Sequence, residues 1–189
     1  MATDTKTSLL DSAERAARTR GFDGFSYADL AADVGITKPS IHHHFANKAT
    51  LAVALMQRYY TNLETACAEI DQEQSTGATR LAALIARYQG ALDGGQSLCL
   101  CVSFSTSTKS LSAETIAEMN RCRSMMTDWL AKTFEQGRDD GTIQNVVDPL
   151  AEAAASLPLL EGAQLAARVT QDTQRFEAAV QLLSIRLRA

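Results

Sequence analysis

The stretch FSYADLAADVGITKPSIHHHFANKATL, residues 25–51, decides the fold of the N-terminal part of this 189-residue chain. Ser26 is followed three residues later by Asp29, a variant of the capping box that marks the start of a helix. Gly35 lies where a helix needs a residue that tolerates the left-handed conformation at its end. The pattern therefore predicts a short helix over residues 26–34.

A second short helix is predicted directly after that glycine, over residues 37–44. Pro39 falls in its first turn, where a missing N–H costs little. Two short helices joined by a glycine-containing turn are typical of a helix-turn-helix, whose second helix reads the major groove of DNA. Its expected exposed positions carry hydrogen-bonding or basic side chains, namely Thr37, Lys38, Ser40, His42 and His43.

The sequence on both sides of this motif also favours helices, because Ala, Leu, Glu, Gln and Arg dominate and prolines are few. We predict an all-α protein of about nine helices, with a helix-turn-helix head over 1–50 and a ligand-binding and dimerisation body over 51–189. Residues 97–106 are apolar but rich in Ser and Thr, so the sequence leaves them open between helix and irregular structure. The other helices are expected over 5–20, from Asn47 to about 74, over 79–92 and 112–138, from Pro149, and from Thr170 or Asp172.

The overall charge of −4 hides a local basic region. Residues 1–50 carry six basic and six acidic residues, and no acid occurs over residues 34–63. A phosphate backbone responds to such a local patch rather than to the net charge of the chain. No apolar run reaches the roughly 20 residues that span a bilayer, and the polar N-terminal residues contain no signal-peptide region. We therefore expect a cytoplasmic protein without a membrane partner, and we expect its four cysteines to be thiols.

The dense pattern from Phe25 to Leu51 resembles the DNA-binding signature of the tetracycline-repressor (TetR/AcrR) family, over residues 7–55 or so. The resemblance implies a transcriptional regulator that binds double-stranded operator DNA. It also implies that some side chains contact the phosphate backbone, namely Ser26, Tyr27, His42 and Lys48, while others face the major groove, namely Thr37, Lys38, Pro39, Ser40 and His43. Pro39 is a departure from the family pattern, since it donates no hydrogen bond and would read a base only through apolar contact.

The rest of the chain resembles the family's body more loosely, in a subgroup of which some members respond to electrophilic or carbonyl compounds through a cysteine near the position of Cys99. That pattern usually has a glycine before the cysteine and an acid near residue 107, where this chain has Leu98 and Ser107. A small-molecule effector is expected in the body, and its identity stays open. The candidate ligand-binding residues are Tyr88, Cys99, Phe104, Met126 and Trp129, which the sequence equally allows to be core residues.

Two C-terminal helices are expected to pair with a second copy of the chain in a four-helix interface, and Pro158 is expected to bend the first of them. Internal packing alone is the alternative for their apolar residues. The side chains expected at this homodimer interface are small or apolar, namely Leu150, Ala153, Ala154, Leu157, Ala163, Ala167, Phe176, Ala179, Val180, Leu183 and Leu187.

The function that the sequence favours is a DNA-binding repressor released by a small-molecule ligand. A covalent thiol or redox switch at Cys99 or Cys101 is the first alternative. A helical-bundle enzyme is the second, but the chain has no Glu-x-x-His pair, phosphate-binding glycine loop or Gly-x-Ser-x-Gly motif. No metal or cofactor is expected. The consecutive histidines 42–44 point about 100° apart on a helix and cannot converge on one ion.

Overall fold

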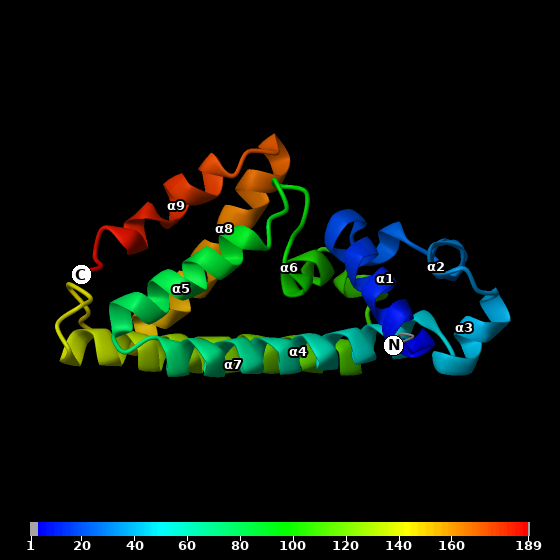
Figure 1. The fold of residues 1–189 in the computed structure, drawn as a ribbon, viewed down its shortest axis with the longest axis horizontal. Coiled ribbons are helices and arrows are strands. Elements are labelled where there is room, and N and C mark those ends of the chain that lie inside the picture. The colour runs from blue at the N-terminus through cyan, green and yellow to red at the C-terminus, as the bar shows by residue number, and fades with distance from the viewer. Residues whose placement is uncertain (1–3, 189) are drawn as a thin grey trace. The chain divides into compact units, whose positions relative to one another are not determined.

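The computed structural model describes residues 4–188, and these divide into two compact units (Figure 1). The first unit comprises residues up to 61 together with 100–121, and the second comprises 62–99 together with the residues from 122 onward. The described residues form nine α-helices and no named strand. The helices are α1 (Thr5–Arg20), α2 (Tyr27–Val34), α3 (Lys38–His44), α4 (Lys48–Glu73), α5 (Gly77–Gly90), α6 (Leu100–Ser105), α7 (Ala113–Asp139), α8 (Pro149–Thr170) and α9 (Gln174–Ser184), with the 3₁₀ turns η1 (Phe22–Gly24) and η2 (Thr108–Ser110).

The first unit is built around α1, which contacts α2, η1 and α6. α1 buries one face at helical spacing, through Leu9, Ala13 and Ala17. Phe22 of η1 packs edge-on against Phe104 of α6, with ring centroids 5.1 Å apart. These contacts give the short helices of the head a hydrophobic core, which helices of seven or eight residues need because they are marginal in isolation.

The second unit contains a large apolar core to which α5, α8 and α9 all contribute. α4 and α7 also pack on each other within this unit. The sulfur atoms of Cys67 on α4 and Met126 on α7 lie 3.8 Å apart. Phe134 and Phe176 are completely buried in this core. Figure 1 shows α5 beside the C-terminal pair α8 and α9, drawn in orange and red.

α5 and α7 approach each other so closely that only glycine fits at their contact. A Cβ atom added at Gly77 would lie 2.3 Å from both Cα and N of Gly137. Gly137 in turn is covered by the side chain of Ile143, which a Cβ at position 137 would meet at 2.3 Å. The two glycines therefore set the distance between the start of α5 and the end of α7.

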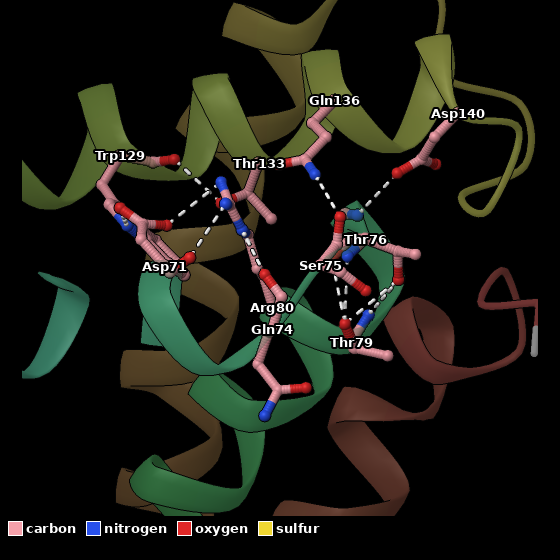
Figure 2. Close-up of polar contacts among 11 residues, drawn as sticks. Asp71, Gln74, Ser75, Thr76, Thr79, Arg80, Trp129, Thr133, Gln136 and Asp140 are labelled. Carbon is pink, nitrogen blue, oxygen red and sulfur yellow. Dashed lines mark hydrogen bonds and ion pairs between the residues drawn. The ribbon is translucent and has the colours of Figure 1, made fainter. Parts of the chain in front are cut away.

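Polar contacts reinforce the same junction, as Figure 2 shows. The N–H of Gly77 donates to Asp140 Oδ2 at 2.9 Å, and Gln136 Nε2 donates to the carbonyl of Ser75 at 2.8 Å. Trp129 Nε1 donates to Asp71 Oδ2 at 3.1 Å, while Arg80 forms an ion pair with the same carboxylate. The first turn of α5 thus receives hydrogen-bond acceptors from the end of α7, as a helix N-terminus requires.

The structure confirms the all-α fold and most of the predicted helices. α5 begins two residues earlier than predicted, because Thr76 caps it by accepting from the N–H of Thr79. The undecided segment contains the short helix α6, and Pro158 lies inside α8. Within residues 4–188, no helix combines the length and the apolar character needed to cross a bilayer.

Candidate nucleic-acid interface

The start of α2 is fixed by a complete capping box. The N–H of Ser26 donates to Asp29 Oδ2 at 2.7 Å, and the Ser26 hydroxyl, which accepts from the N–H of Asp29, also lies 2.7 Å from that oxygen. The hydrogen bond from the Ser26 hydroxyl is the main cause that lowers the pKa of the Asp29 carboxyl below its ordinary value. Ser26 is exposed, so its backbone and hydroxyl lie at the surface where the resemblance expects phosphate.

The turn between α2 and α3 depends on Gly35, whose φ of 74° lies in the left-handed region. The N–H groups of Gly35 and Ile36 both donate to the carbonyl of Ala31 at 3.0 Å and close the end of α2. Leu30 of α2 and Ile41 of α3 are buried, with 1% and 0% of their surfaces exposed. The predicted helix-turn-helix is therefore formed, with each helix anchored by a buried aliphatic side chain.

The outer face of α3 is exposed at every position predicted to read bases. Thr37, the N-cap, has its hydroxyl 3.0 Å from that of Ser40, so one of the two hydroxyls serves as donor to the other. Lys38 is the first residue of α3 and is exposed there, as is Pro39 after it. His43 is also exposed, whereas His44 is half-buried with its ring 5.5 Å from that of His43. The surface is short, polar and basic.

Tyr27 and His42 form a pair between α2 and the end of α3. Their ring centroids lie 5.0 Å apart, and the Tyr27 hydroxyl donates to the carbonyl of Phe45 at 3.0 Å. Burial raises the pKa of Tyr27 to about 12. His42 Nδ1 lies 3.0 Å from the carbonyl oxygen of Ala46. That oxygen can only accept, so Nδ1 carries a proton in this bond, and Nε2 is the ring nitrogen left for a partner.

Lys48, predicted to contact phosphate, has its ammonium engaged within the head. Nζ donates to the carbonyls of Phe22 and Phe25, both at 2.5 Å. It also lies 4.5 Å and 4.2 Å from the centroids of the same two rings. Burial lowers the pKa of Lys48, against the opposing effects of Asp23 and Asp29. A phosphate contact by this side chain stays a prediction.

Arg58 belongs to the first unit, and sequence reasoning did not single out its role. Its guanidinium on α4 binds Asp11 at 2.6 Å and Glu14 at 2.7 Å, both on α1. Glu14 also pairs with Arg18 at 2.8 Å. The available signal was a lone arginine in the acid-free stretch 34–63 together with two acids three residues apart on the first helix. The sequence alone does not show that Arg58 pairs with these two acids, because only the fold brings α4 beside α1.

Four of the five candidate ligand residues lie in the second unit. Tyr88, Met126 and Trp129 belong to its apolar core, and Cys99 is buried. Phe104, in contrast, belongs to the first unit and is completely buried against Phe22. The indole N–H of Trp129 donates a hydrogen bond to the Asp71 carboxylate.

The backbone of Cys99 is held by a buried glutamine. The N–H of Cys99 donates to Gln164 Oε1 at 2.9 Å, and Gln164 has only 1% of its surface exposed. Cys101 and Cys122 are buried as well. Burial raises the pKa of the Cys67 thiol to about 12, so this cysteine is a poor nucleophile.

The C-terminal helices correct the prediction of which side chains face a second copy. Seven of the predicted interface residues are buried inside the subunit: Ala153, Leu157, Ala163, Ala167, Phe176, Val180 and Leu183. Other large apolar side chains on or beside α8 and α9 are exposed instead, with Leu150 the one shared with the prediction: Val147, Leu150, Leu165, Val169, Leu182 and Ile185. Exposed apolar side chains of this density are typical of a protein–protein contact.

Residues 4–188 contain no cluster of three or more His, Cys, Asp or Glu side chains arranged to hold a metal ion. The side chains of the head offer hydrogen-bond donors and positive charge at an exposed helix N-terminus. These groups suit an anionic polymer such as DNA.

Comparison with known proteins agrees with this arrangement. Residues 9–55 match the sequence model of the "Bacterial regulatory proteins, tetR family". The HTH-type transcriptional repressor NemR of Escherichia coli is 27% identical over 182 residues, which cover 94% of this chain and 90% of NemR. The crystal structure of reduced NemR gives a TM-score of 0.83 at 25% identity, with 98% of each chain covered.

Two other solved structures share the fold over almost the whole chain. A TetR-family transcriptional regulator from Agrobacterium tumefaciens is 28% identical and has a TM-score of 0.92, with 98% of both chains covered. AibR, solved with isovaleryl coenzyme A and operator DNA, has a TM-score of 0.73 at 22% identity and covers 96% of this chain and 99% of its own. The relatives named by function are transcriptional regulators.

Proposed function

Because this chain belongs to the TetR family of bacterial transcriptional regulators, we propose that it is a homodimeric repressor that a small molecule releases from its operator. The observation that carries the proposal is the exposed N-terminus of α3 on a buried helix-turn-helix scaffold. In a dimer the two α3 helices enter successive major grooves about 34–36 Å apart on a roughly palindromic site. We propose no catalytic activity and no cofactor.

The proposed DNA contacts follow from exposure and donor chemistry. Lys38 brings a flexible positive charge to the start of α3, where the helix dipole also favours phosphate and acceptor groups. Thr37 and Ser40 contribute hydroxyls beside it. Base reading is assigned to Thr37, Lys38, Pro39, Ser40 and His43, and phosphate contact to Ser26, Tyr27 and His42. The Lys48 ammonium, also expected at phosphate, is engaged by the carbonyls of Phe22 and Phe25.

The proposed dimer face is the exposed apolar surface on and beside α8 and α9. Val169 and Leu182 have 85% and 65% of their surfaces exposed, which is costly for side chains of this size in water. A second copy presenting the same surface would bury both sets in an isologous interface. The four-helix arrangement predicted from the sequence is retained, with a different set of contacting side chains.

The ligand is proposed to act through α4, which begins in the head at Lys48 and continues to Glu73 in the body. A ligand that binds one position of this helix better than another shifts the head between states of different operator affinity. AibR, which shares the fold, was solved with both a ligand and operator DNA. The proposed ligand contacts are Tyr88, Cys99, Phe104, Met126 and Trp129, and a boundary near residue 50 is proposed between head and body.

The test is a mobility shift of the full chain on DNA flanking its own gene, across a salt series and against random competitor DNA. We expect selective, salt-sensitive binding. Lys38→Ala should weaken operator binding about tenfold, within the range for one lost contact. The matched control is Lys132→Ala, an exposed lysine of α7, which should bind as the native chain does. Equal affinity of native chain and Lys38→Ala would remove Lys38 from the interface.

A thiol switch at Cys99 or Cys101 is a second candidate, favoured by the similarity to NemR, which has been solved in a reduced form. Both cysteines have 5% of their surfaces exposed, so a reagent must reach them through local opening. Labelling that abolishes operator binding, and that fails to do so in Cys99→Ser, would support the switch. Full labelling with unchanged operator affinity would exclude it.

A further inference from the structure

Lys48 is the first residue of α4, and its ammonium lies against the turn between α1 and α2. Two of its three N–H groups donate to the carbonyls of Phe22 and Phe25. Both aromatic rings are buried, with 3% and 4% of their surfaces exposed, and both present their π systems to the charge. Carbonyl oxygens and aromatic faces are the neutral groups that best stabilise a cation.

The turn that Lys48 holds sets the start of α2. Phe22 opens η1, and Phe25 directly precedes Ser26, the N-cap of α2. Gly21, at the other end of this turn, has a φ of 81°, which any other residue rarely adopts. The two carbonyls of Phe22 and Phe25 belong to this turn, so the hydrogen bonds from Lys48 link its backbone to the first turn of α4.

We propose that Lys48 is a positioning residue, which connects the first turn of α4 to the start of α2 and so sets the orientation of the helix-turn-helix. The inference rests on the proposed function, since orientation matters only to a head that binds DNA. It replaces the phosphate contact expected for this side chain. If α4 moved, the Lys48 side chain would move the carbonyls of Phe22 and Phe25 with it. The start of α2, which follows directly after Phe25, would then move as well.

Positioning and phosphate contact differ in their salt dependence. A lysine that neutralises a phosphate releases a counterion, so its removal lowers the slope of log K against log salt by about 0.9 per contact. A positioning lysine has no phosphate partner, so its removal lowers affinity without changing the slope. It also affects operator binding more than binding to random DNA, because random DNA is held by charge and not by an exact orientation of α3.

The experiment measures operator and random-DNA affinity of the full chain across a salt series for Lys48→Met, which keeps an apolar stem without the charge. We expect at least a tenfold loss on the operator, little loss on random DNA and an unchanged slope. A phosphate contact by Lys48 would instead lower the slope by about 0.9 in this variant. Faster hydrogen exchange at residues 21–29 in Lys48→Met would show the loosened turn directly.

Lys48→Gln serves if the methionine variant does not fold, because its amide keeps N–H donors within reach of the carbonyls. We expect it to retain more operator affinity than any side chain without a donor, again with an unchanged slope. A slope lowered by about 0.9, or unchanged operator affinity in both variants, would overturn the proposal. Absence of selective binding by the native chain would instead refute the proposed function, whatever the exchange data show about the turn.

Discussion

The head and the body of this protein are held together by contacts of different sequence range. In the head, the capping box of Ser26 and the left-handed Gly35 act within a few residues of each other. In the body, the junction of α5 and α7 joins residues about 60 positions apart, such as Gly77 with Asp140. The helix-turn-helix is therefore specified by a local pattern, whereas the body depends on pairings that form only when distant segments meet.

This difference explains where surface and interior chemistry lie. The exposed end of α3 is available for binding because the two short helices are anchored from their inner side, where Leu30 and Ile41 are buried. The body buries most of its apolar side chains in one continuous core, and what remains exposed is grouped on and beside α8 and α9. Local signals thus specify a reading surface, and distant contacts specify the scaffold that carries it.

The most damaging single change should be one that separates α5 from α7. In Gly77→Ala the new Cβ would lie 2.3 Å from the backbone of Gly137, so the helices must move apart. We expect the free energy of unfolding to fall by about 3 kcal/mol, the upper range for overpacking. Urea unfolding followed by circular dichroism measures it.

Gly90→Ala is the matched control, because it lies at the other end of α5 and a Cβ there meets nothing within 4 Å. It should leave stability unchanged or raise it by up to about 1 kcal/mol, the helix preference of Ala over Gly. Similar stabilities for the two variants would mean that the close approach of the helices does not hold the body together.

A smaller effect is expected in the head, where Arg58 joins α4 to α1. Arg58→Met keeps an apolar stem but leaves Asp11 and Glu14 without this partner. Its side chain is 23% exposed, so solvent screens part of the interaction, and we expect a loss of about 1–2 kcal/mol. Thermal unfolding of the full chain measures it.

The control is Arg15→Met, which breaks the pair with Asp33 between two side chains that are 66% and 51% exposed. Exposed pairs contribute little, so this variant should stay within about 0.5 kcal/mol of the native chain. Equal losses in the two variants would show that burial does not distinguish these ion pairs, and the comparison between them would fail.

The sequence predicted the elements whose signals are local. The cap at Ser26 and the turn at Gly35 can be predicted from sequence, because each acts on residues three or four positions away. The carbonyl partners of the Lys48 ammonium could not be predicted in this way, because Phe22 and Phe25 lie 26 and 23 residues earlier in the chain. Lys48 was accordingly predicted to contact phosphate from the family resemblance alone.

The proposed dimer face lies on the two helices expected from the sequence but involves a different set of side chains. α8 is rich in alanine and leucine on every side, so its sequence does not show which side turns inward. Packing against α5 and α9 buries Ala163 and Ala167 and leaves Leu165 and Val169 exposed. Only the arrangement of the neighbouring helices decides between these two faces.

The smallest effect is expected for the capping box that Ser26 and Asp29 form at the start of α2. Ser26→Ala removes the hydroxyl that caps α2, and we expect a loss of about 1 kcal/mol at neutral pH, with Ser26→Thr as the control that keeps a cap. The same hydroxyl is the main cause that lowers the pKa of Asp29. A carboxyl with a lowered folded-state pKa contributes stability above its unfolded pKa and loses it as the pH falls through the folded value.

The difference in stability between native chain and Ser26→Ala should therefore narrow as the pH falls from the ordinary Asp value of 3.8 through the lowered folded-state pKa of Asp29. Urea unfolding at neutral and acidic pH measures the two differences, and an NMR titration should show the Asp29 pKa moving up in the variant. A difference that stays constant with pH would mean that the Ser26 hydroxyl acts on the backbone of α2 alone. The carboxylate of Asp29 would then take part in the capping box through the backbone N–H of Ser26 rather than through its hydroxyl.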